Sequence, residues 1–413
     1  MKSWIKVKLS DLGNVVGGAT PSTLNEDYYG GDIAWITPKD LSNFEGRFIS
    51  HGERNITKLG LKSCSTTLLP KNTVLFTSRA PIGYVAISSN ELATNQGFKS
   101  IVPNKNTDYL FLYYLLKYNK DKIEGMGSGT TFKEVSGATM KNIEVNVPQD
   151  KEEQIRIGKI LSSLDDKIEQ NTRMNKVLEE IARALFHRWF VAFEFPNAEG
   201  KPYKSAGGKM VESEMGSVPE GWETNTLDNV VDIIGGGTPK TSTSEYWNGT
   251  IPWFSVIDAP NDGDIFVIDT EKHITQLGIE NSSTRLLPVG TTIISARGTV
   301  GKCAVVGIPM TMNQSCYGIR GKKEGVDYFV YFTIRGMVSE LQSKGHGSVF
   351  NTITRDTINT QKIVVPDVSV MKKYNDHVTP LLQKIQTNLT ENRHLSELRD
   401  GLLPKLMSGD IEV

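Results

Sequence analysis

The sequence VVGGATPST at residues 15–23 returns as IIGGGTPKT at residues 233–241, an offset of 218 positions. The offset needs no gap from residue 15 to residue 148. It aligns further identical residues in the two halves, among them Trp35 with Trp253, Arg79 with Arg297, Asn95 with Asn313 and Gln96 with Gln314. Self-similarity over this length indicates a tandem duplication, with units of roughly 200 residues.

The composition is that of a folded protein with balanced charge. The 413 residues include 38% apolar and 23% charged side chains, and the formal net charge is −1. Such a balance is typical of globular chains, and near-neutrality disfavours a uniformly basic polyanion binder. Three cysteines are too few for a disulfide framework or a zinc cluster. Since the N-terminal segment lacks an apolar signal region and no run of 18 apolar residues occurs, we expect a cytoplasmic protein.

Each repeat divides into a globular part and a long helix. Residues 1–150 and 217–367 are rich in glycine and β-forming residues, in short runs separated by turn signals. Long helices are predicted over residues 151–190 and, with a C-terminal tail, over residues 368–413. Residues 191–216 are rich in Pro, Gly, Ser and Lys and are predicted to form a linker. We therefore expect an α+β fold in which two globular domains are separated by two long helices.

One shorter helix is expected within each globular part. The apolar periodicity places these helices near residues 108–120 and near residues 327–342. The surrounding strand-like runs predict compact, irregular α+β or mostly-β domains.

The apolar residues of the two long helices recur at alternating steps of four and three, and the helices correspond at an offset of 217. This period of 3.5 is typical of a coiled-coil seam. The alternative is two helices that each pack only on their own domain. If the helices pack antiparallel, Asn171 faces Asn392 and Asn175 faces Asn388. The predicted seam consists of Ile157, Leu161, Leu164, Ile168, Asn171, Asn175, Leu178, Leu185, Val378, Leu381, Ile385, Asn388, Asn392, Leu395, Leu402 and Leu406.

Motifs for catalysis or metal binding are not found in the sequence. The six histidines are dispersed without metal-ligand spacing, and GTVGK at residues 298–302 fails the spacing of a phosphate-binding loop. GMGSG at residues 125–129 follows a predicted helix, whereas a dinucleotide-binding loop precedes one. We therefore predict that the chain has no catalytic residues and binds no metal or cofactor.

Three segments carry a family likeness. They are LSSLDDKIEQNTRMNKVLEEIARALFHRWF at residues 161–190, YKSAGGKMVESEMGSVPEGWE at 203–223 and ENRHLSELRDGLLPKLMSGDIEV at 391–413. Together with the duplication, they resemble the DNA-specificity subunit of type I restriction–modification systems. The likeness covers essentially the whole chain, although the globular parts match the family only in outline.

The resemblance implies two target-recognition domains at opposite ends of an antiparallel coiled coil. Each domain would read one half of an asymmetric bipartite site in double-stranded DNA, and the helix pair would set the spacer. Two methyltransferase subunits would dock on the helices, bind S-adenosylmethionine and methylate adenine. Two restriction subunits would act as motor and nuclease with ATP and magnesium. The alternatives are a stand-alone DNA-modifying enzyme and a pure scaffold.

The repeat also sorts candidate DNA contacts. Positions identical in both repeats cannot distinguish two different half-sites and suit scaffold or phosphate contacts, whereas differing positions are candidate base readers. In the loop at residues 15–23 and its repeat, glycines let backbone amides approach an anion, and Thr20 and Thr238 can donate to phosphate. The alternative is a tight turn before a strand. Ser22 against Lys240 is the varying position of this loop.

Other identical positions have two interpretations. Arg79 and Arg297 could bind phosphate or guanine, or could pair with carboxylates. The repeated Asn-Gln pair could read adenine, but its identity in both repeats favours a scaffold role. Trp35 and Trp253 are expected in the core.

Differing positions follow the two tryptophans and occur in the loops GMGSGTTFKEV at residues 125–135 and KGHGSVFNTI at residues 344–353. The small hydroxyl and glycine residues of these loops also suit phosphate contact. The candidate DNA contacts are Thr20, Ser22, Thr37, Lys39, Arg79, Ser128, Thr130, Lys133, Thr238, Lys240, Ser255, Arg297, His346, Ser348 and Asn351.

Overall fold

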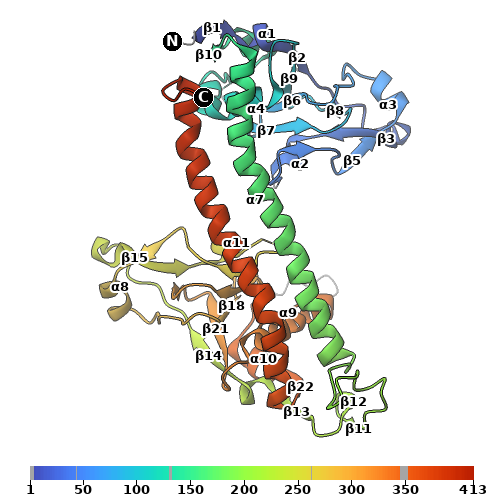
Figure 1. The fold of residues 1–413 in the computed structure, drawn as a ribbon, viewed down its shortest axis with the longest axis vertical. Coiled ribbons are helices and arrows are strands. Elements are labelled where there is room, and N and C mark those ends of the chain that lie inside the picture. The colour runs from blue at the N-terminus through green and yellow to red at the C-terminus, as the bar shows by residue number, and fades with distance from the viewer. Residues whose placement is uncertain (1–3, 43, 130–132, 262, 345–351) are drawn as a thin grey trace. The chain divides into compact units, whose positions relative to one another are not determined.

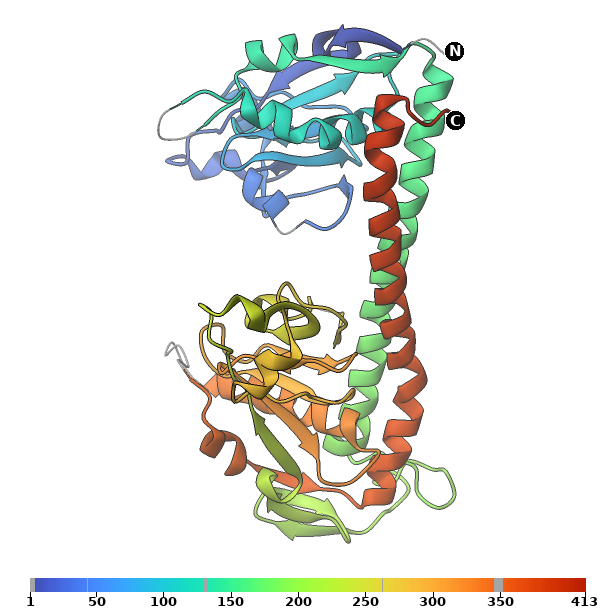
Figure 2. The same cartoon turned by 90° about the vertical axis from the view of Figure 1, so that its left-hand side faces the viewer.

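The computed structural model describes residues 4–42, 44–129, 133–261, 263–344 and 352–413. The chain falls into two compact units (Figures 1 and 2). Unit 1 comprises Met1–Glu169 and His394–Val413, and unit 2 comprises Gln170–Arg393. Two long helices, α7 (Lys151–Phe186) and α11 (Val368–Ser408), contribute residues to both units. None of the helices in the described ranges is long and apolar enough to cross a membrane.

Unit 1 contains a five-stranded sheet in the order β2-β9-β6-β7-β4, a three-stranded sheet in the order β5-β3-β8 and the pair β1-β10. Pairing within these sheets is antiparallel except for the pairs β3–β8 and β4–β7. The strands are β1 (Trp4–Lys8), β2 (Gly13–Gly17), β3 (Tyr29–Ile36), β4 (Phe48–Ile49), β5 (Arg54–Ile56), β6 (Val74–Ser78), β7 (Ile82–Ser88), β8 (Ala93–Thr94), β9 (Lys99–Pro103) and β10 (Glu144–Pro148). The short helices are α1 (Leu9–Leu12), α2 (Pro38–Ser42), α3 (Lys58–Lys62), α4 (Tyr109–Tyr118), α5 (Lys120–Gly125) and α6 (Gly137–Asn142).

Unit 2 repeats this topology. Its sheets have the orders β14-β21-β18-β19-β16 and β17-β15-β20, with the pair β13-β22. The strands are β13 (Glu223–Thr226), β14 (Val231–Gly235), β15 (Trp247–Phe254), β16 (Phe266–Val267), β17 (His273–Ile274), β18 (Thr292–Ser295), β19 (Cys303–Val306), β20 (Thr311–Met312), β21 (Cys316–Gly321) and β22 (Lys362–Val365). The helices are α8 (Gln276–Glu280), α9 (Asp327–Lys344) and α10 (Arg355–Asn359). The duplicated sequence is thus a duplicated mixed fold of helices and sheets, as expected.

The shorter helix of each globular part lies against its sheet. Helix α4 begins after Asp108, whose carboxylate accepts the Phe111 backbone N–H at 2.9 Å and caps the helix. Six of its ten residues are buried, and all five residues of the central strand β6 are buried beneath it. The expected helix near residues 108–120 is therefore α4, and the one near residues 327–342 is α9. Burial on both sides explains why β6 begins with three consecutive apolar residues, Val74–Phe76.

Within each unit, α7 and α11 lie side by side (Figure 2). In unit 1, Ile157 and Leu161 of α7 share one hydrophobic cluster with Leu406 of α11 and with the sheet. In unit 2, buried Leu382, rather than its neighbour Leu381, joins the cluster formed with α9. These helix residues therefore pack on the globular part and on the other helix at once.

Asparagines link the two helices within unit 2. Asn171 donates a hydrogen bond to Asn392 at 2.9 Å, and Asn388 donates to Asn175 at 2.8 Å. These are the pairs that the sequence opposes in an antiparallel arrangement. Asn175 in turn donates to Asp264 at 3.0 Å, in a loop of the globular part. The polar layer thus joins both helices to the domain, and such a layer fixes register.

Part of the expected linker is packed on unit 2. Phe195 is 6% exposed and stacks on Tyr203 and on Trp222, with ring centroids 4.6 and 4.8 Å apart. A hairpin of β11 (Met210–Ser213) and β12 (Gly216–Pro219) follows. Burial of aromatic side chains therefore anchors a segment whose composition alone suggested a linker.

Candidate functional site

The GGATP loop of unit 1 is held between the strands β3 and β8. Trp35 is 5% exposed and donates its indole N–H to the Ala19 carbonyl at 3.1 Å. The Ala19 amide donates to the Thr94 carbonyl at 3.1 Å. A Cβ on Gly18 would lie 2.2 Å from the Asn95 carbonyl oxygen. Glycine is therefore needed here for close backbone packing.

The GGGTP loop of unit 2 has the same construction. Trp253 donates to the Gly237 carbonyl at 2.9 Å, and the Gly237 amide donates to the Met312 carbonyl at 3.0 Å. A Cβ on Gly236 would lie 1.9 Å from the Asn313 carbonyl oxygen. The expectation that these loop amides approach an anion is corrected at Ala19 and Gly237, because both amides are already bonded within the fold. The two tryptophans are core residues, as predicted.

The hydroxyls of Thr20 and Thr238 also have partners inside the protein. Thr20 Oγ1 donates to Gln96 Oε1, and Thr238 Oγ1 donates to Gln314 Oε1. Each threonine proton predicted to reach phosphate is therefore bonded to a glutamine.

Thr37 and Ser255 are N-cap-like residues of short helical turns. Thr37 Oγ1 donates to Asp40 Oδ2 at 2.7 Å, and Ser255 Oγ donates to Asp258 Oδ2 at 3.0 Å. Each aspartate also accepts a backbone amide from the next loop, from Glu53 at 2.7 Å in unit 1. The hydroxyls thus organise two loops, and their protons are committed to carboxylates.

Asp40 and Asp258 are residues that the sequence reasoning missed. Asp258 accepts the Glu271 amide at 2.7 Å, the counterpart of the Glu53 bond in unit 1. Both the aspartates and the glutamates recur at the offset of 218. A search for identical carboxylates across the repeat could have found them.

The side chains that vary between the repeats are on the surface. Ser22 and Lys240 are exposed. Lys39 is exposed and forms an ion pair with Glu53 at 2.7 Å, which raises the pKa of Lys39. The position equivalent to Lys39 is Ile257, which is 68% exposed. The same frame therefore presents different chemistry in the two units.

The two arginines differ in their surroundings. Arg79 lies 3.6 Å from Glu134, which also lies 3.4 Å from Lys99. Arg79 is thus paired with a carboxylate, which was the alternative to a DNA contact. Arg297 is exposed on the surface of unit 2. Near Arg79, Ser128 and Lys133 are exposed. The remaining candidates lie outside the described residues: Thr130, His346, Ser348 and Asn351.

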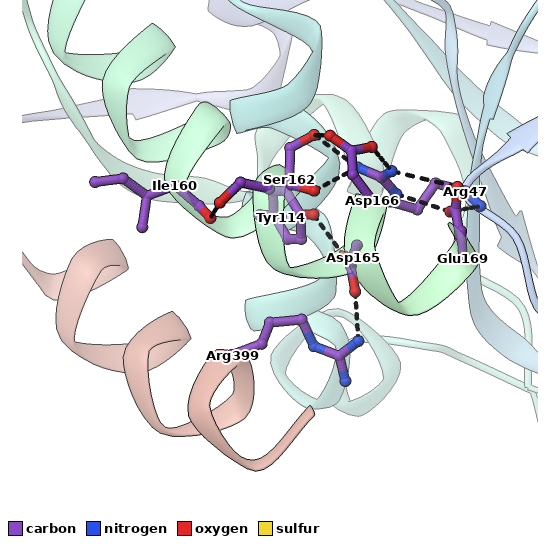
Figure 3. Close-up of polar contacts among 9 residues, drawn as sticks. Arg47, Tyr114, Ile160, Ser162, Asp165, Asp166, Glu169 and Arg399 are labelled. Carbon is purple, nitrogen blue, oxygen red and sulfur yellow. Dashed lines mark hydrogen bonds and ion pairs between the residues drawn. The ribbon is translucent and has the colours of Figure 1, made fainter. Parts of the chain in front are cut away.

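A buried charged cluster anchors the globular part of unit 1 to α7 (Figure 3). Arg47, whose side chain is 3% exposed, donates to Ser162 Oγ at 2.7 Å and to Glu169 Oε1 at 2.9 Å. It also bonds Asp166. Burial disfavours the charged guanidinium, but the hydrogen bonds that it donates to the Glu169 and Asp166 carboxylates outweigh this effect and raise the pKa of Arg47. Arg47 therefore remains charged and binds three side chains on one face of α7 (Figure 3).

Asp165, the neighbour of Asp166 in α7, joins three helices. Its carboxylate accepts the Tyr114 hydroxyl of α4 at 2.5 Å and forms an ion pair with Arg399 of α11 at 2.6 Å (Figure 3). Burial and the neighbouring Asp165 charge raise the pKa of Tyr114. Sequence periodicity could not find this cluster, because Arg47 and Tyr114 are far from α7 in the chain.

A cavity of about 260 Å³ in unit 1 and one of about 340 Å³ in unit 2 lie at equivalent places. Tyr113 and Lys117 line the first, and Tyr331 and Arg335 line the second. Arg335 is paired with Glu179 of α7. Among the described residues, no group of three or more His, Cys, Asp or Glu side chains is placed to hold a metal ion.

A family model and two relatives from other organisms point to the same class of protein. Residues 1–180 and 219–396 match the family described as "Type I restriction modification DNA specificity domain". The chain is 34% identical over 418 residues to the type I restriction enzyme MjaIX specificity subunit of Methanocaldococcus jannaschii, covering 100% of this chain and 94% of the relative. It is 27% identical over 370 residues to the HindI specificity subunit of Haemophilus influenzae, covering 76% and 80%.

The fold is also similar to a solved structure. The crystal structure of a type I restriction–modification S subunit from M. genitalium has a TM-score of 0.62 and 17% identity, and the match covers 98% of this chain and 96% of that one. The repeated DNA-specificity domain and the full-length match to a relative at 34% identity establish the family. The chain belongs to the specificity subunits of type I restriction–modification systems, the non-catalytic subunits that recognise DNA sequence.

Proposed function

We propose that the two recognition domains, residues 1–150 and 217–367, each read one half of an asymmetric bipartite DNA site. The observation that carries this proposal is the contrast between an identical frame and different exposed side chains. Strand order is the same in both units, while Ser22 is replaced by Lys240 and Lys39 by Ile257. Two readers with one frame and different surface chemistry suit two different half-sites.

We further propose that α7 and α11 form an antiparallel coiled coil that sets the spacer and docks two methyltransferase subunits. The antiparallel direction is supported separately in each unit. In unit 1, Arg156 bonds Val413 at 3.1 Å and Asp165 bonds Arg399. In unit 2, Tyr374 bonds Ala182 at 3.1 Å and Asn388 bonds Asn175 at 2.8 Å. Half-site spacing in DNA readers follows from the geometry that separates the two reading elements.

The proposed complex contains two restriction subunits in addition and works in the cytoplasm. S-adenosylmethionine would bind to the methyltransferase subunits, and ATP and magnesium to the restriction subunits. This chain would supply the sequence preference and bind none of these cofactors.

Methylome sequencing of DNA from cells that express this chain with its methyltransferase tests the proposal. We expect a split motif of two short specific halves around an unread spacer, methylated on both strands. Exchanging Ser22 and Lys240 should leave the spacer unchanged and alter the half-sites only. One contiguous motif, or the absence of any motif, would contradict the assignment of one half-site to each domain.

A further inference from the structure

The glutamines that follow Asn95 and Asn313 have one amide atom engaged and one open. Thr20 Oγ1 donates to Gln96 Oε1, and Thr238 Oγ1 donates to Gln314 Oε1. Both glutamines are exposed, and neither Nε2 has a hydrogen-bond partner among the described residues. The same arrangement occurs in both units, which are separate copies of the fold.

The backbone beneath each glutamine is fixed. The backbone N–H of Asn95 donates to the Ile36 carbonyl at 3.0 Å, and the side-chain Oδ1 of Asn95 accepts the backbone N–H of Gly97 at 2.8 Å. In the same way, the backbone N–H of Asn313 donates to the Phe254 carbonyl at 2.9 Å, and its side-chain Oδ1 accepts the backbone N–H of Ser315 at 3.0 Å. Each asparagine closes a tight turn, so the glutamine starts from a rigid base. This explains the repeated Asn-Gln pair: the asparagine shapes the turn and the glutamine projects from it.

We propose that Gln96 and Gln314 each donate a hydrogen bond from Nε2 to a DNA phosphate, with Thr20 and Thr238 as positioning residues. Reading adenine requires the amide oxygen and nitrogen to face the base edge together, as acceptor and donor. Here the threonine hydroxyl takes one lone pair of Oε1 and fixes the direction of the amide, whereas both hydrogens of Nε2 remain available as donors. A donor alone suits an acceptor that every DNA sequence offers, which is the phosphate oxygen.

The identity of this pair in both units supports phosphate over base. The proposal rests on the proposed function, in which the two domains read different half-sites. A group that read one base would then be expected to differ between them. The phosphate contact predicted for the Thr20 and Thr238 hydroxyls is thereby reassigned to the glutamine that each threonine orients.

The test uses the full chain assembled with its methyltransferase. Gln96→Glu replaces the donor with a carboxylate that repels phosphate, and Thr20→Val removes the hydroxyl while keeping the side-chain shape. We expect Gln96→Glu to weaken binding by about 10- to 100-fold, because it removes a hydrogen bond to a charged group and adds repulsion. Thr20→Val should weaken binding less, and the methylated motif should be unchanged in both variants. Asn106→Asp, the same amide-to-carboxylate change in another exposed loop of unit 1, should bind as the wild type does.

DNA with single neutral methylphosphonate linkages gives a second readout. At one position in the first half-site, the neutral linkage should weaken wild-type binding and remove most of the difference between wild type and Gln96→Glu. A change of one base in the methylated motif of Gln96→Glu would overturn the proposal in favour of base reading. Wild-type affinity of both glutamine variants, Gln96→Glu and Gln314→Glu, would show that neither glutamine contacts DNA. A failure of the proposed function differs from both, since the wild type itself would then show no split motif.

Discussion

Asp165 of α7 and Arg399 of α11 form an ion pair at 2.6 Å, and their side chains are only 7% and 19% exposed. In the second repeat, at an offset of 217, the equivalent positions hold Leu382 and Ala182. Both of these residues are fully buried. Equivalent positions of the two helices thus hold an ion pair in unit 1 and two apolar residues in unit 2. Leucine and alanine are therefore suitable replacements for Asp165 and Arg399.

The pair should therefore behave as a coupled unit. We expect Arg399→Ala alone to lower the free energy of unfolding by about 3–5 kcal/mol, since it leaves the buried Asp165 carboxylate without its cation. Asp165→Leu alone should also lower it, although Arg399 keeps its ion pair with Asp400 at 2.8 Å. The double variant should recover part of this loss, because it reproduces the pair found in the second repeat but still leaves the Tyr114 hydroxyl without the Asp165 acceptor. Hydrogen exchange of the α4 amides would report the stability of unit 1 for each variant.

An exposed ion pair provides the control for this cycle. Lys6 and Glu144 pair in the same unit with side chains 65% and 51% exposed. Lys6→Ala should cost less than about 1 kcal/mol. Strictly additive losses at Asp165 and Arg399 would contradict the coupling.

Arg47 should not tolerate lysine. Its guanidinium donates from Nε to Glu169 and from Nη1 to Ser162, and it also bonds Asp166. A lysine ammonium carries the charge but cannot match this planar set of donors. We expect Arg47→Lys to lower the free energy of unfolding by about 1–3 kcal/mol, because buried acceptors lose their partners. Lys39→Arg, at an exposed pair, is the control, and equal melting temperatures for both variants would refute the anchoring role.

The extent of the duplication was visible in the sequence because glycines, tryptophans and Asn-Gln pairs recur at one offset. Periodicity also located α4, α9 and the long helices, since apolar spacing reports which face of a helix is buried. Neither signal identifies the group that lies opposite a given face. Arg47 contacts α7 residues more than 100 positions away, and no local pattern encodes that pairing.

The loops that carry the candidate residues were visible in the sequence, but the hydrogen bonds of their side chains were not. The loops around Thr20 and Thr37 do form a shared frame, but their hydroxyl protons bind Gln96 and Asp40 inside it. A hydroxyl or amide in a loop can satisfy the fold or meet a ligand equally well. The sequence does not distinguish these uses until the neighbouring loops are placed.

The loop glycines offer a test with controls next to them in the chain. Gly18→Ala and Gly236→Ala place a Cβ against the carbonyl of Asn95 or Asn313, and the backbone must move. We expect each to cost about 1–3 kcal/mol, as overpacking does, and to lower methylation of the cognate site. Gly17→Ala and Gly235→Ala meet nothing closer than 3.9 Å and should have smaller effects on both. Equal methylation by all four variants would show that loop position is unimportant for recognition.

Stability should fall at alkaline pH. Burial raises the pKa of Tyr328 to about 12 and raises the pKa of Tyr113, Tyr114 and Tyr374 further. An unfolded tyrosine ionises near a pKa of about 10. The folded state therefore keeps protons that the unfolded state loses, and the stability contributed by these groups is complete below about pH 10 and is lost as the pH rises above it. Lys117, whose pKa burial lowers, acts in the opposite direction as a single group.

Urea unfolding between about pH 8 and pH 11, followed together with tyrosinate absorbance, measures this dependence. As the pH rises, the free energy of unfolding should fall with a slope that approaches about 1.4 kcal/mol per pH unit for each buried tyrosine that ionises on unfolding. Tyr113→Phe is a clean probe, because the Tyr113 hydroxyl has no hydrogen-bond partner among the described residues while burial raises its pKa. In this variant the free energy of unfolding should fall less steeply with pH, by the contribution of one tyrosine, and stability at neutral pH should be nearly that of the wild type. Ionisation of all tyrosines near pH 10 without unfolding would contradict their burial, since a folded protein that admits four tyrosinates cannot hold these side chains in its core.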